Sequence, residues 1–193
     1  CFLITDQWFL LVDKITCIIL AGGDSSRMGQ DKGLITISGK PMIQHVIDLV
    51  ISFTSNIIII ANSSKYQKFG YPVYEVLVKD SGPLAGIFTG LTNSKTQQNI
   101  ILTCDSPFIS YRLIELLLKH SEGKDIVYPT LEGKEYPLTA IYNKTSFDML
   151  KKQLENRKLR VKDLLTLTNS MEVKLNNSFT RDMTNLNTPT DLE

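Results

Sequence analysis

The sequence has few of the features that mark disulfide-bonded, membrane-spanning or nucleic-acid-binding proteins. Its 193 residues include only 3 cysteines, Cys1, Cys17 and Cys104, and no two of them have C-x-x-C spacing. A disulfide framework and a zinc site are therefore not expected, and a reducing compartment fits better. Apolar runs such as Ile57–Ala61 are far shorter than the roughly 20 residues of a membrane-spanning helix. We expect no membrane partner.

The charge balance argues against a second class of partner. The chain carries 21 basic and 20 acidic residues, which gives a formal net charge of +1. Proteins that bind nucleic acid usually carry a basic excess, because they neutralise backbone phosphates. We therefore expect no nucleic-acid partner. With 42% hydrophobic residues, the chain has enough apolar surface for one domain with its own core.

Residues 1–13 are apolar but do not fit a secretory signal. They contain Asp6 and Asp13, and they show neither a basic n-region nor a small-residue cleavage site. We interpret them as an N-terminal extension before the first strand. Residues 14–193 are expected to form a single domain, and the protein is expected to be cytoplasmic.

Strands and helices alternate from residue 14 onward. Buried strands are predicted where apolar residues run together, at 14–20, 56–61 and 99–104. Helices are predicted at 41–52 and from 82 to 91, where apolar residues recur on one helical face. The other predicted elements are short helices at 63–69 and 160–167, helices at 110–120 and 146–157, and strands at 73–78, 125–130, 138–142 and 171–175, with a hairpin or loop at 131–136 and a terminal helix capped by Thr188-Pro189.

Strands that are apolar at nearly every position must be covered by helices on both faces. Alternating strands and helices then favour parallel pairing through right-handed crossovers. The sequence therefore predicts an α/β fold, a single-domain Rossmann-like three-layer sandwich with a mostly parallel sheet.

A glycine-rich, cationic loop follows the first strand directly. In residues 18–34, IILAGGDSSRMGQDKGL, the strand runs into Gly22 and Gly23, and Arg27 and Lys32 follow. Glycines let a ligand approach the backbone N–H groups closely, and cations neutralise anionic charge. In an open parallel sheet, ligands bind at the carboxyl ends of the strands, where this loop lies. The pattern predicts a polyphosphate site; the alternative is a glycine turn with incidental surface cations.

The spacing excludes two other phosphate-binding loops. A Walker loop needs Ser or Thr after Gly-Lys, whereas Gly39-Lys40 is followed by Pro41. A dinucleotide-binding G-x-G-x-x-G is also missing, because the glycines of the loop stand at 22, 23 and 29.

Asp105 ends the strand at 99–104 and is predicted to lie at the same sheet edge as the loop. A carboxylate beside a triphosphate site favours Mg²⁺ as the metal cofactor. The alternative is a helix cap, since Ser106-Pro107 follows.

Motifs along most of the chain match a known family. The loop reads LAGGxSxRMGxDK from Leu20, and it is followed by GKPMIQHV (39–46), GPLAGI (82–87), TCDSPF (103–108), EYPLTAIY (135–142) and NLNTPTDL (185–192). This set resembles the sugar-nucleotide-type nucleotidyltransferases and, within them, most closely the molybdenum cofactor guanylyltransferase family. The resemblance extends from about Lys14 to the end of the chain.

The resemblance implies a Mg²⁺-dependent transfer of GMP from GTP to the phosphate of molybdopterin, with release of pyrophosphate. It also implies transient contact with cofactor-biosynthesis or molybdoenzyme partners. The implied roles are nucleotide binding for Leu20, Ala21, Gly22, Gly23, Lys32 and Asp105, catalysis for Arg27, Lys32 and Asp105, metal binding for Asp105, and acceptor-side contacts for Asn185 and Asn187. Relatives carry an aspartate where this chain has Val76, and Asp80 is the nearest candidate replacement.

Two alternative functions remain open from the sequence. One is a related nucleotidyltransferase that uses CTP or a sugar-phosphate acceptor. The other is a non-catalytic module that carries a nucleotide or cofactor, against which the presence of Arg27, Lys32 and Asp105 argues.

Several other residues have a structural and a functional interpretation. We expect structural or surface roles for His45 and His120 and a core position for Cys104. The basic cluster at Arg157, Lys158, Arg160 and Lys162 is interpreted as a solvated helix face. The functional alternative is a basic rim for the pterin phosphate, with Tyr136 or Tyr142 stacked on the pterin.

Overall fold

The computed structural model describes residues 14–22 and 31–186 of the chain. Several sequence predictions lie outside these residues: the extension at 1–13, Gly23 and Arg27 of the loop, Asn187, and the terminal helix at Thr188-Pro189.

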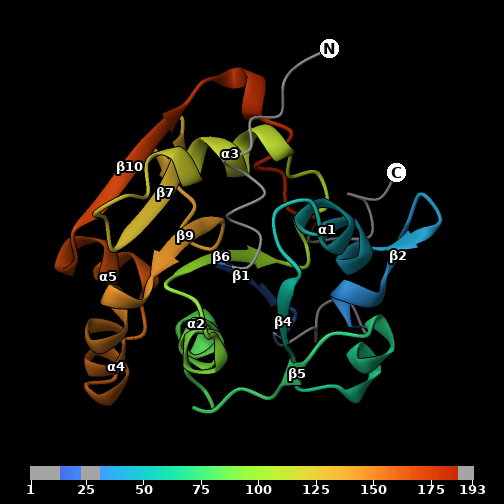
Figure 1. The fold of residues 1–193 in the computed structure, drawn as a ribbon, viewed down its shortest axis with the longest axis horizontal. Helices are drawn as coiled ribbons and strands as arrows, with labels where there is room; N and C mark the ends of the chain where they lie inside the picture. Colours follow the sequence, from blue (N-terminus) through green and yellow to red (C-terminus); the bar gives the residue numbers. More distant parts are fainter. Residues whose placement is uncertain (1–13, 23–30, 187–193) are drawn as a thin grey trace.

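One large, mostly parallel sheet organises the fold (Figure 1), in the strand order β10-β7-β9-β6-β1-β4-β5 with β8 paired to β7. Within this sheet, only β8 and β9 pair antiparallel to their neighbours. The strands are β1 (Ile15–Leu20), β4 (Asn56–Ile60), β5 (Val73–Tyr74), β6 (Gln98–Thr103), β7 (Ile126–Leu131), β8 (Lys134–Glu135), β9 (Ala140–Asn143) and β10 (Ser170–Leu175); β2 (Thr36–Ile37) and β3 (Lys40–Pro41) form a separate small ribbon.

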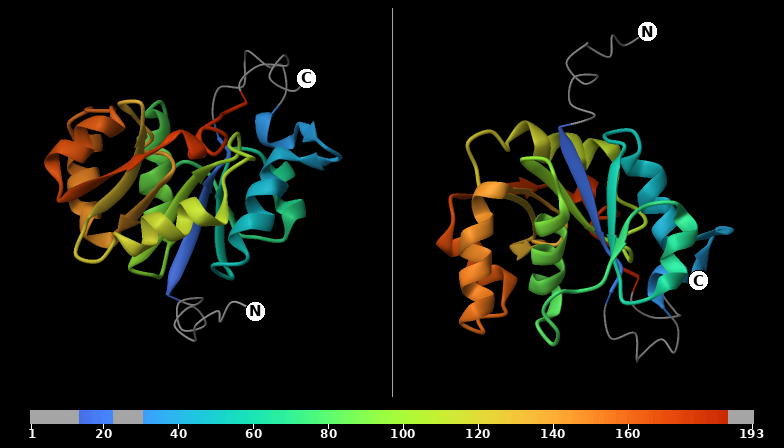
Figure 2. Two further views of the ribbon diagram at one scale, coloured as in Figure 1. Left: turned by 90° about the horizontal axis from the view of Figure 1, so that it is seen from above. Right: turned by 60° about the horizontal axis from the view of Figure 1, so that its bottom comes forward.

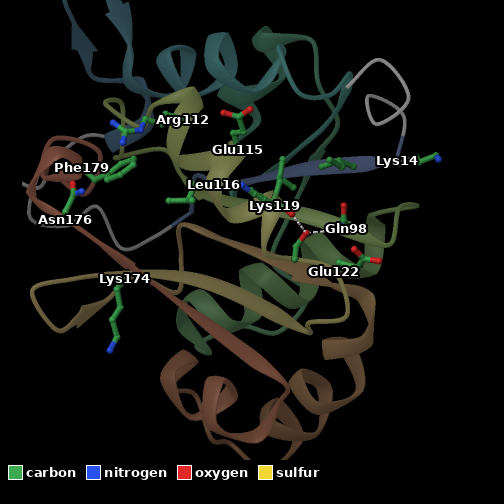
Figure 3. A pocket seen from close by; sticks show the side chains of 13 residues that line it. Lys14, Gln98, Arg112, Glu115, Leu116, Lys119, Glu122, Lys174, Asn176 and Phe179 are labelled. Carbon is green, nitrogen blue, oxygen red and sulfur yellow. Dashed lines mark hydrogen bonds between the residues drawn. The ribbon is translucent and has the colours of Figure 1, made fainter. Parts of the chain in front are cut away.

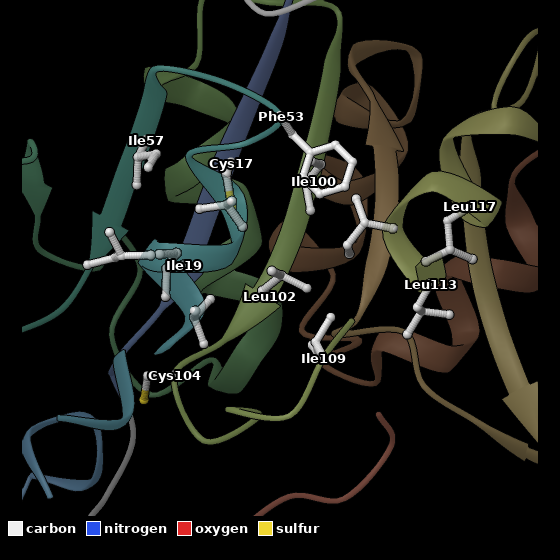
Figure 4. Packing of buried hydrophobic residues seen from close by; sticks show 14 of the residues in the cluster. Cys17, Ile19, Phe53, Ile57, Ile100, Leu102, Cys104, Ile109, Leu113 and Leu117 are labelled. Atoms are coloured by element: carbon white, nitrogen blue, oxygen red, sulfur yellow. The ribbon is translucent and has the colours of Figure 1, made fainter. Parts of the chain in front are cut away.

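Helices cover both faces of the sheet. Apolar residues of α1 (Met42–Val50) and α3 (Tyr111–Lys119) pack in one core cluster, part of which is drawn in Figure 4. Those of α2 (Gly82–Asn93), α4 (Phe147–Glu155) and α5 (Val161–Leu167) pack in a second cluster. The 3-10 turns are η2 (Lys32–Leu34), η3 (Ser64–Phe69), η4 (Lys144–Ser146) and η5 (Asn177–Phe179). The three-layer α/β architecture predicted from the sequence is confirmed.

The central strand β1 explains why the apolar runs are continuous. All its residues are buried. Cys17 and Ile19 pack in the cluster under α1 and α3, while Ile18 and Leu20 pack in the cluster under α2. Because successive side chains point to opposite faces, a strand buried on both sides is apolar at nearly every position. The exception in β1 is Thr16, whose hydroxyl accepts a hydrogen bond from Thr96 Oγ1 at 2.8 Å.

The helix α2 lies unusually close to β1. A Cβ atom at Gly90 would stand 2.3 Å from Cγ2 of Ile18, and one at Gly86 would stand 3.1 Å from Cδ2 of Leu20. The two views of Figure 2 show α4 beside α2, where Phe88 and Phe147 stack with ring centroids 5.2 Å apart. The small residues of α2 thus bring its first turn to the carboxyl end of β1.

Two predicted elements differ from the structure. The strand predicted at 73–78 ends at Tyr74, because the next amides bond to side chains: Val76 N donates to Asn62 Oδ1 at 3.3 Å, and Leu77 N donates to Thr89 Oγ1 at 3.0 Å. The helix predicted at 63–69 is a 3-10 helix, η3, which begins one residue later. None of the described helices is both long and apolar enough to cross a membrane.

Candidate active site

A cavity of about 210 Å³ opens at the carboxyl ends of β1, β4 and β6. Its walls come from seven parts of the chain that meet at this edge: the end of β1, the segment around η2, the end of β4, the segment after β5, the first turns of α2, the end of β6 with the loop after it, and the loop between β8 and β9. The lining residues are Leu20, Ala21, Gly22, Lys32, Ile60, Val76, Gly82, Pro83, Gly86, Thr103, Cys104, Asp105 and Leu138.

The backbone after β1 is held from both sides. Ala21 N donates to Ile60 O at 2.9 Å, and Cys104 N donates to Leu20 O at 3.1 Å. Gly22 follows, exposed, on the cavity wall. A Cβ at Gly22 would make only ordinary contacts, 3.7 Å to Ile60 O and 3.8 Å to Ala61 Cα. The described residues around Gly22 therefore do not require a glycine here, and the absent side chain leaves the backbone open to the cavity.

Lys32 and Asp105 bring opposite charges to the cavity. Nζ of Lys32 lies 3.8 Å from Oδ2 of Asp105, and the two side chains are 26% and 17% exposed. The other carboxylate oxygen, Oδ1 of Asp105, is buried and has no hydrogen-bond partner among the described residues. A buried carboxylate oxygen without a donor is poorly stabilised unless a cation reaches it.

The donor set at Asp105 suits one kind of metal ion. Within residues 14–22 and 31–186 there is no group of three or more His, Cys, Asp or Glu residues that could hold a metal. Mg²⁺ typically binds through one or two carboxylates and takes its remaining ligands from substrate phosphates and water. A single orphaned carboxylate oxygen at a phosphate-sized cavity fits that pattern, whereas it does not fit a structural zinc site.

The start of α2 adds partial positive charge. Gly82, Pro83 and Gly86 of its first turns line the cavity. The N-cap residue Ser81 does not cap the helix with its side chain, since its hydroxyl donates to Lys79 O at 3.1 Å. The first N–H groups of a helix lack partners inside the helix and attract anions. This end of the cavity is thus suited to phosphate oxygens.

The C-terminal segment is tied to the loop that carries Asp105. Ser106 Oγ donates to Asn185 Oδ1 at 3.0 Å, and Leu186 N donates to Asp105 O at 3.0 Å. A shared hydrogen bond between Thr103 Oγ1 and Ser106 Oγ, 2.8 Å long, continues this network to the end of β6. Two sequence motifs far apart in the chain therefore meet beside the cavity.

Asp105 does not cap the helix that follows it. The N-cap of α3 is Ser110, whose Oγ accepts from Leu113 N at 3.3 Å. Asp182 Oδ1 in turn accepts from Ser110 N at 2.7 Å, a contact that sequence analysis missed because it joins residues 72 positions apart. The capping alternative for Asp105 is wrong.

The remaining candidates lie elsewhere. Asp80 is exposed, with a φ of 54°, and is not part of the cavity wall, which Val76 does line. Tyr142 is fully buried, and its hydroxyl donates to Pro137 O at 3.0 Å, so its ring is not accessible for stacking. Lys162 forms an ion pair with Glu135 at 2.8 Å.

The two histidines and Cys104 have structural surroundings. His45 Nε2 lies 3.0 Å from Ile37 O, and His120 Nδ1 lies 2.8 Å from Leu116 O. Cys104 is buried in the core and also borders the cavity. Burial is the main cause that raises the pKa of its thiol, and the nearby Asp105 raises it further. A protonated, buried thiol is not a nucleophile.

A larger cavity, of about 980 Å³, lies along α3 (Figure 3). It reaches Lys14 and Gln98, at the amino-terminal ends of β1 and β6, and its charged side chains have both signs, as Arg112 and Glu115 illustrate. None of its lining residues belongs to the predicted phosphate site. Cavity size alone therefore does not identify the site.

Comparison with known proteins gives a consistent picture. Residues 17–170 match the family described as the MobA-like NTP transferase domain. The chain is 37% identical to the probable molybdenum cofactor guanylyltransferase of Flavobacterium johnsoniae over 94% of this chain and 96% of that protein. It is 35% identical to the molybdenum cofactor guanylyltransferase of Vibrio parahaemolyticus over 91% of each chain. These matches confirm the resemblance seen in the motifs.

Solved structures share the fold. Molybdopterin-guanine dinucleotide biosynthesis protein A from Archaeoglobus fulgidus has a TM-score of 0.78 at 23% identity, covering 92% of this chain and 94% of its own. CMP:2-keto-3-deoxy-manno-octonic acid synthetase, solved with CTP, has a TM-score of 0.67 at 16% identity, covering 93% and 95%. At these identities the likeness establishes the architecture.

Proposed function

The chain belongs to the MobA-like NTP transferase family, and on that premise we propose that it transfers GMP from GTP to the phosphate of molybdopterin. The products are pyrophosphate and the guanine dinucleotide form of the cofactor. The observation that carries the proposal is the common cavity of Gly22, Lys32 and Asp105 at the carboxyl edge of the sheet.

The chemistry of this reaction suits the residues present. An oxygen of the acceptor phosphate attacks the α-phosphorus of GTP, a new P–O bond forms, and the bond to the β-phosphate oxygen breaks as pyrophosphate leaves with its electron pair. A phosphate nucleophile is already ionised at neutral pH, so the step needs positioning and charge neutralisation more than a general base. The cavity accordingly offers a cation, a carboxylate and a helix start rather than a Ser-His-Asp set.

Each group has a role in binding or neutralisation. The backbone from Leu20 to Gly22 faces the nucleotide, and the start of α2 faces its phosphates. Gly23 follows in the same motif and is proposed to share this role. Lys32, with Arg27 from the same loop, neutralises charge that develops on the departing pyrophosphate. Asp105 would hold Mg²⁺ through Oδ1, which has no hydrogen-bond partner within the described part of the chain, and the ion, when bound, would supply further charge neutralisation at the phosphates.

The acceptor is proposed to enter beside the C-terminal segment. Asn185 is fixed there by Ser106, and Asn187 follows in the same motif. Release of the product to a molybdoenzyme or a cofactor-biosynthesis protein would involve a transient contact. A cytoplasmic location agrees with the free thiols at Cys17 and Cys104.

A single assay tests the proposal against both alternatives. The protein is incubated with molybdopterin, Mg²⁺ and either GTP or CTP, and pyrophosphate and the dinucleotide product are quantified. We expect pyrophosphate with GTP only when molybdopterin is present, and loss of the signal when EDTA removes the metal ion. A preference for CTP would show that the protein is a cytidylyltransferase rather than a guanylyltransferase. Binding of GTP without release of pyrophosphate would indicate a non-catalytic carrier module.

A further inference from the structure

Tyr66 is a buried tyrosine that lies beneath the segment carrying Lys32. It belongs to η3, between β4 and β5, and its side chain is 0% exposed. Its hydroxyl donates a hydrogen bond to Oδ1 of Asp31, a residue 35 positions earlier in the chain and directly before Lys32. The phenol therefore links η3 to the segment that presents the cation.

Among the described residues, the Asp31 carboxylate has a single hydrogen-bond partner, the Tyr66 hydroxyl. It occupies the N-cap position of η2, where aspartate side chains usually accept from the first amides of the helix. Here the Asp31 side chain makes no capping hydrogen bond, although its backbone carbonyl accepts from Leu34 N at 3.0 Å. Local helix capping therefore does not account for the position of this carboxylate.

The residue after Lys32 is held by the same phenol. A Cβ atom at Gly33 would stand 2.5 Å from the Tyr66 oxygen and 3.2 Å from Cβ of Cys104. Gly33 is thus packed between Tyr66 and the end of β6, which leads directly into Asp105. Both neighbours of Lys32 in the chain contact Tyr66, so the tyrosine fixes the backbone on either side of the cation.

The phenol is the donor in this hydrogen bond. Burial is the main cause that raises the pKa of Tyr66, and the nearby Cys104 and Asp31 raise it further. The hydroxyl keeps its proton and remains the donor, with the Asp31 carboxylate as acceptor.

We propose that Tyr66 is a positioning residue for nucleotidyl transfer, which holds Lys32 in place through Asp31 and Gly33. The inference rests on the proposed function of the cavity. Lys32 Nζ must sit where charge develops in the transition state, close to Asp105 Oδ2 at 3.8 Å. A misplacement of about 1 Å in such a site costs about 100-fold in rate. Tyr66 has no part in the chemistry itself.

The test compares substitutions that keep or remove the hydrogen bond. Tyr66→Phe keeps the ring but loses the donor, and we expect kcat to fall about 10- to 100-fold while KM for GTP changes less than about 3-fold. Asp31→Ala loses the acceptor and should give a similar fall. Asp31→Asn keeps an oxygen acceptor and should restore most of kcat. The double variant Tyr66→Phe/Asp31→Ala should be no slower than either single variant.

Thr54→Val provides the matched control for loss of a buried hydroxyl. Thr54 is fully buried, and its Oγ1 donates to Ile15 O at 2.6 Å, at the opposite edge of the sheet from Asp105. The Thr54→Val substitution should lower the melting temperature of the protein and leave kcat unchanged.

The outcomes test the positioning role of Tyr66 separately from the proposed guanylyltransferase function. If wild-type protein releases no pyrophosphate, the proposed function fails. If it is active but Tyr66→Phe and Asp31→Ala retain near-normal kcat, or if their effects add in the double variant, the positioning role is overturned. Should Tyr66→Phe fail to fold, the comparison of Asp31→Ala with Asp31→Asn decides alone, because only a positioning role predicts that the amide rescues kcat.

Discussion

Lys32 Nζ lies 3.8 Å from Asp105 Oδ2, although Lys32 follows β1 and Asp105 follows β6. This distance of 3.8 Å is longer than a direct charge-assisted hydrogen bond between an ammonium and a carboxylate, which is about 2.7–2.9 Å. The two charges therefore lie close enough together to act on one bound ligand. This arrangement fits a triphosphate that meets the ammonium while its metal ion meets the carboxylate.

Removing either charge should abolish most of the activity. We expect Lys32→Ala or Asp105→Ala to lower turnover by about 10²- to 10³-fold or more, because each group neutralises charge in the transition state. The melting temperature should stay close to that of the wild type. Lys124→Ala is the matched control: its Nζ donates to Asn169 Oδ1 at 3.3 Å, outside the cavity, so turnover should not change. Near-normal turnover in either active-site variant would show that the site is misassigned.

Substitutions at two glycines should distinguish an effect on ligand binding from an effect on stability. Gly22→Ala adds a methyl group that makes only ordinary contacts with the described residues but projects at the cavity wall. The free energy of unfolding should change by less than about 0.5 kcal/mol. The Kd for GTP should rise about 5- to 150-fold, because the methyl group costs about 1–3 kcal/mol against the nucleotide. Calorimetric titration with GTP and Mg²⁺ measures the change.

Gly90→Ala is the counterpart of this variant. Its new methyl group would stand 2.3 Å from Cγ2 of Ile18, which is a steric clash inside the core. We expect a loss of about 1–3 kcal/mol of unfolding free energy with an unchanged Kd in the folded protein. If Gly22→Ala binds GTP as the wild type does, the backbone at Gly22 is not against the nucleotide.

The buried thiols predict how stability depends on pH. Burial raises the pKa of Cys17 and of Cys104, so both stay protonated in the folded chain. An unfolded chain releases these protons above about pH 8.5. The free energy of unfolding should therefore be unaffected by the thiols below that pH and fall above it, by up to about 1.4 kcal/mol per thiol for each pH unit. Denaturant titrations at pH 8 to 10 measure the slope.

The Cys17→Ala variant isolates one thiol in that experiment. The variant should be less stable than the wild type below about pH 8.5 because it leaves a cavity, and its free energy of unfolding should fall less steeply above that pH. A slope identical to the wild type would contradict a buried, protonated Cys17.

The C-terminal segment should affect the acceptor more than the nucleotide. Ser106→Ala removes the donor that holds Asn185 Oδ1. We expect a fall of about 10-fold in kcat/KM for molybdopterin, of the size of one lost hydrogen bond, with little change in GTP affinity. Asp182→Ala is the control in the same segment: it removes the acceptor of Ser110 N, 2.7 Å away, and should mainly lower stability. Equal effects on both substrates would argue against an acceptor-side role for Asn185.

Burial on both faces is why the central strands could be predicted from the sequence. Burial on both faces favours apolar residues at nearly every position, and β1, β4 and β6 each contain such a run. The antiparallel insertion of β9 between β6 and β7 could not be predicted, because side-chain alternation is the same for either strand direction. The early end of β5 depends on amides that bond to Asn62 and Thr89, contacts that arise only in the folded chain.

The site, too, contains residues that the sequence predicts and residues that it does not. Gly22, Lys32 and Asp105 stand at strand ends, and the topology of a parallel sheet brings such ends to one edge. Tyr66 was missed because tertiary packing alone brings it to the site, and it stands neither at a strand end nor in a recognisable ligand pattern. Leu138 lies in the motif at 135–142, but an apolar side chain gives no signal of ligand contact, so its place in the cavity wall was not predicted.

A crystal soaked with GTP and Mg²⁺ in the absence of molybdopterin tests the central claim most directly. Electron density should show the triphosphate in the cavity at the end of β1, with phosphate oxygens near Lys32 Nζ and the metal ion at Asp105 Oδ1. A nucleotide bound elsewhere, for example in the larger cavity along α3, with the edge cavity holding only water, would contradict the account.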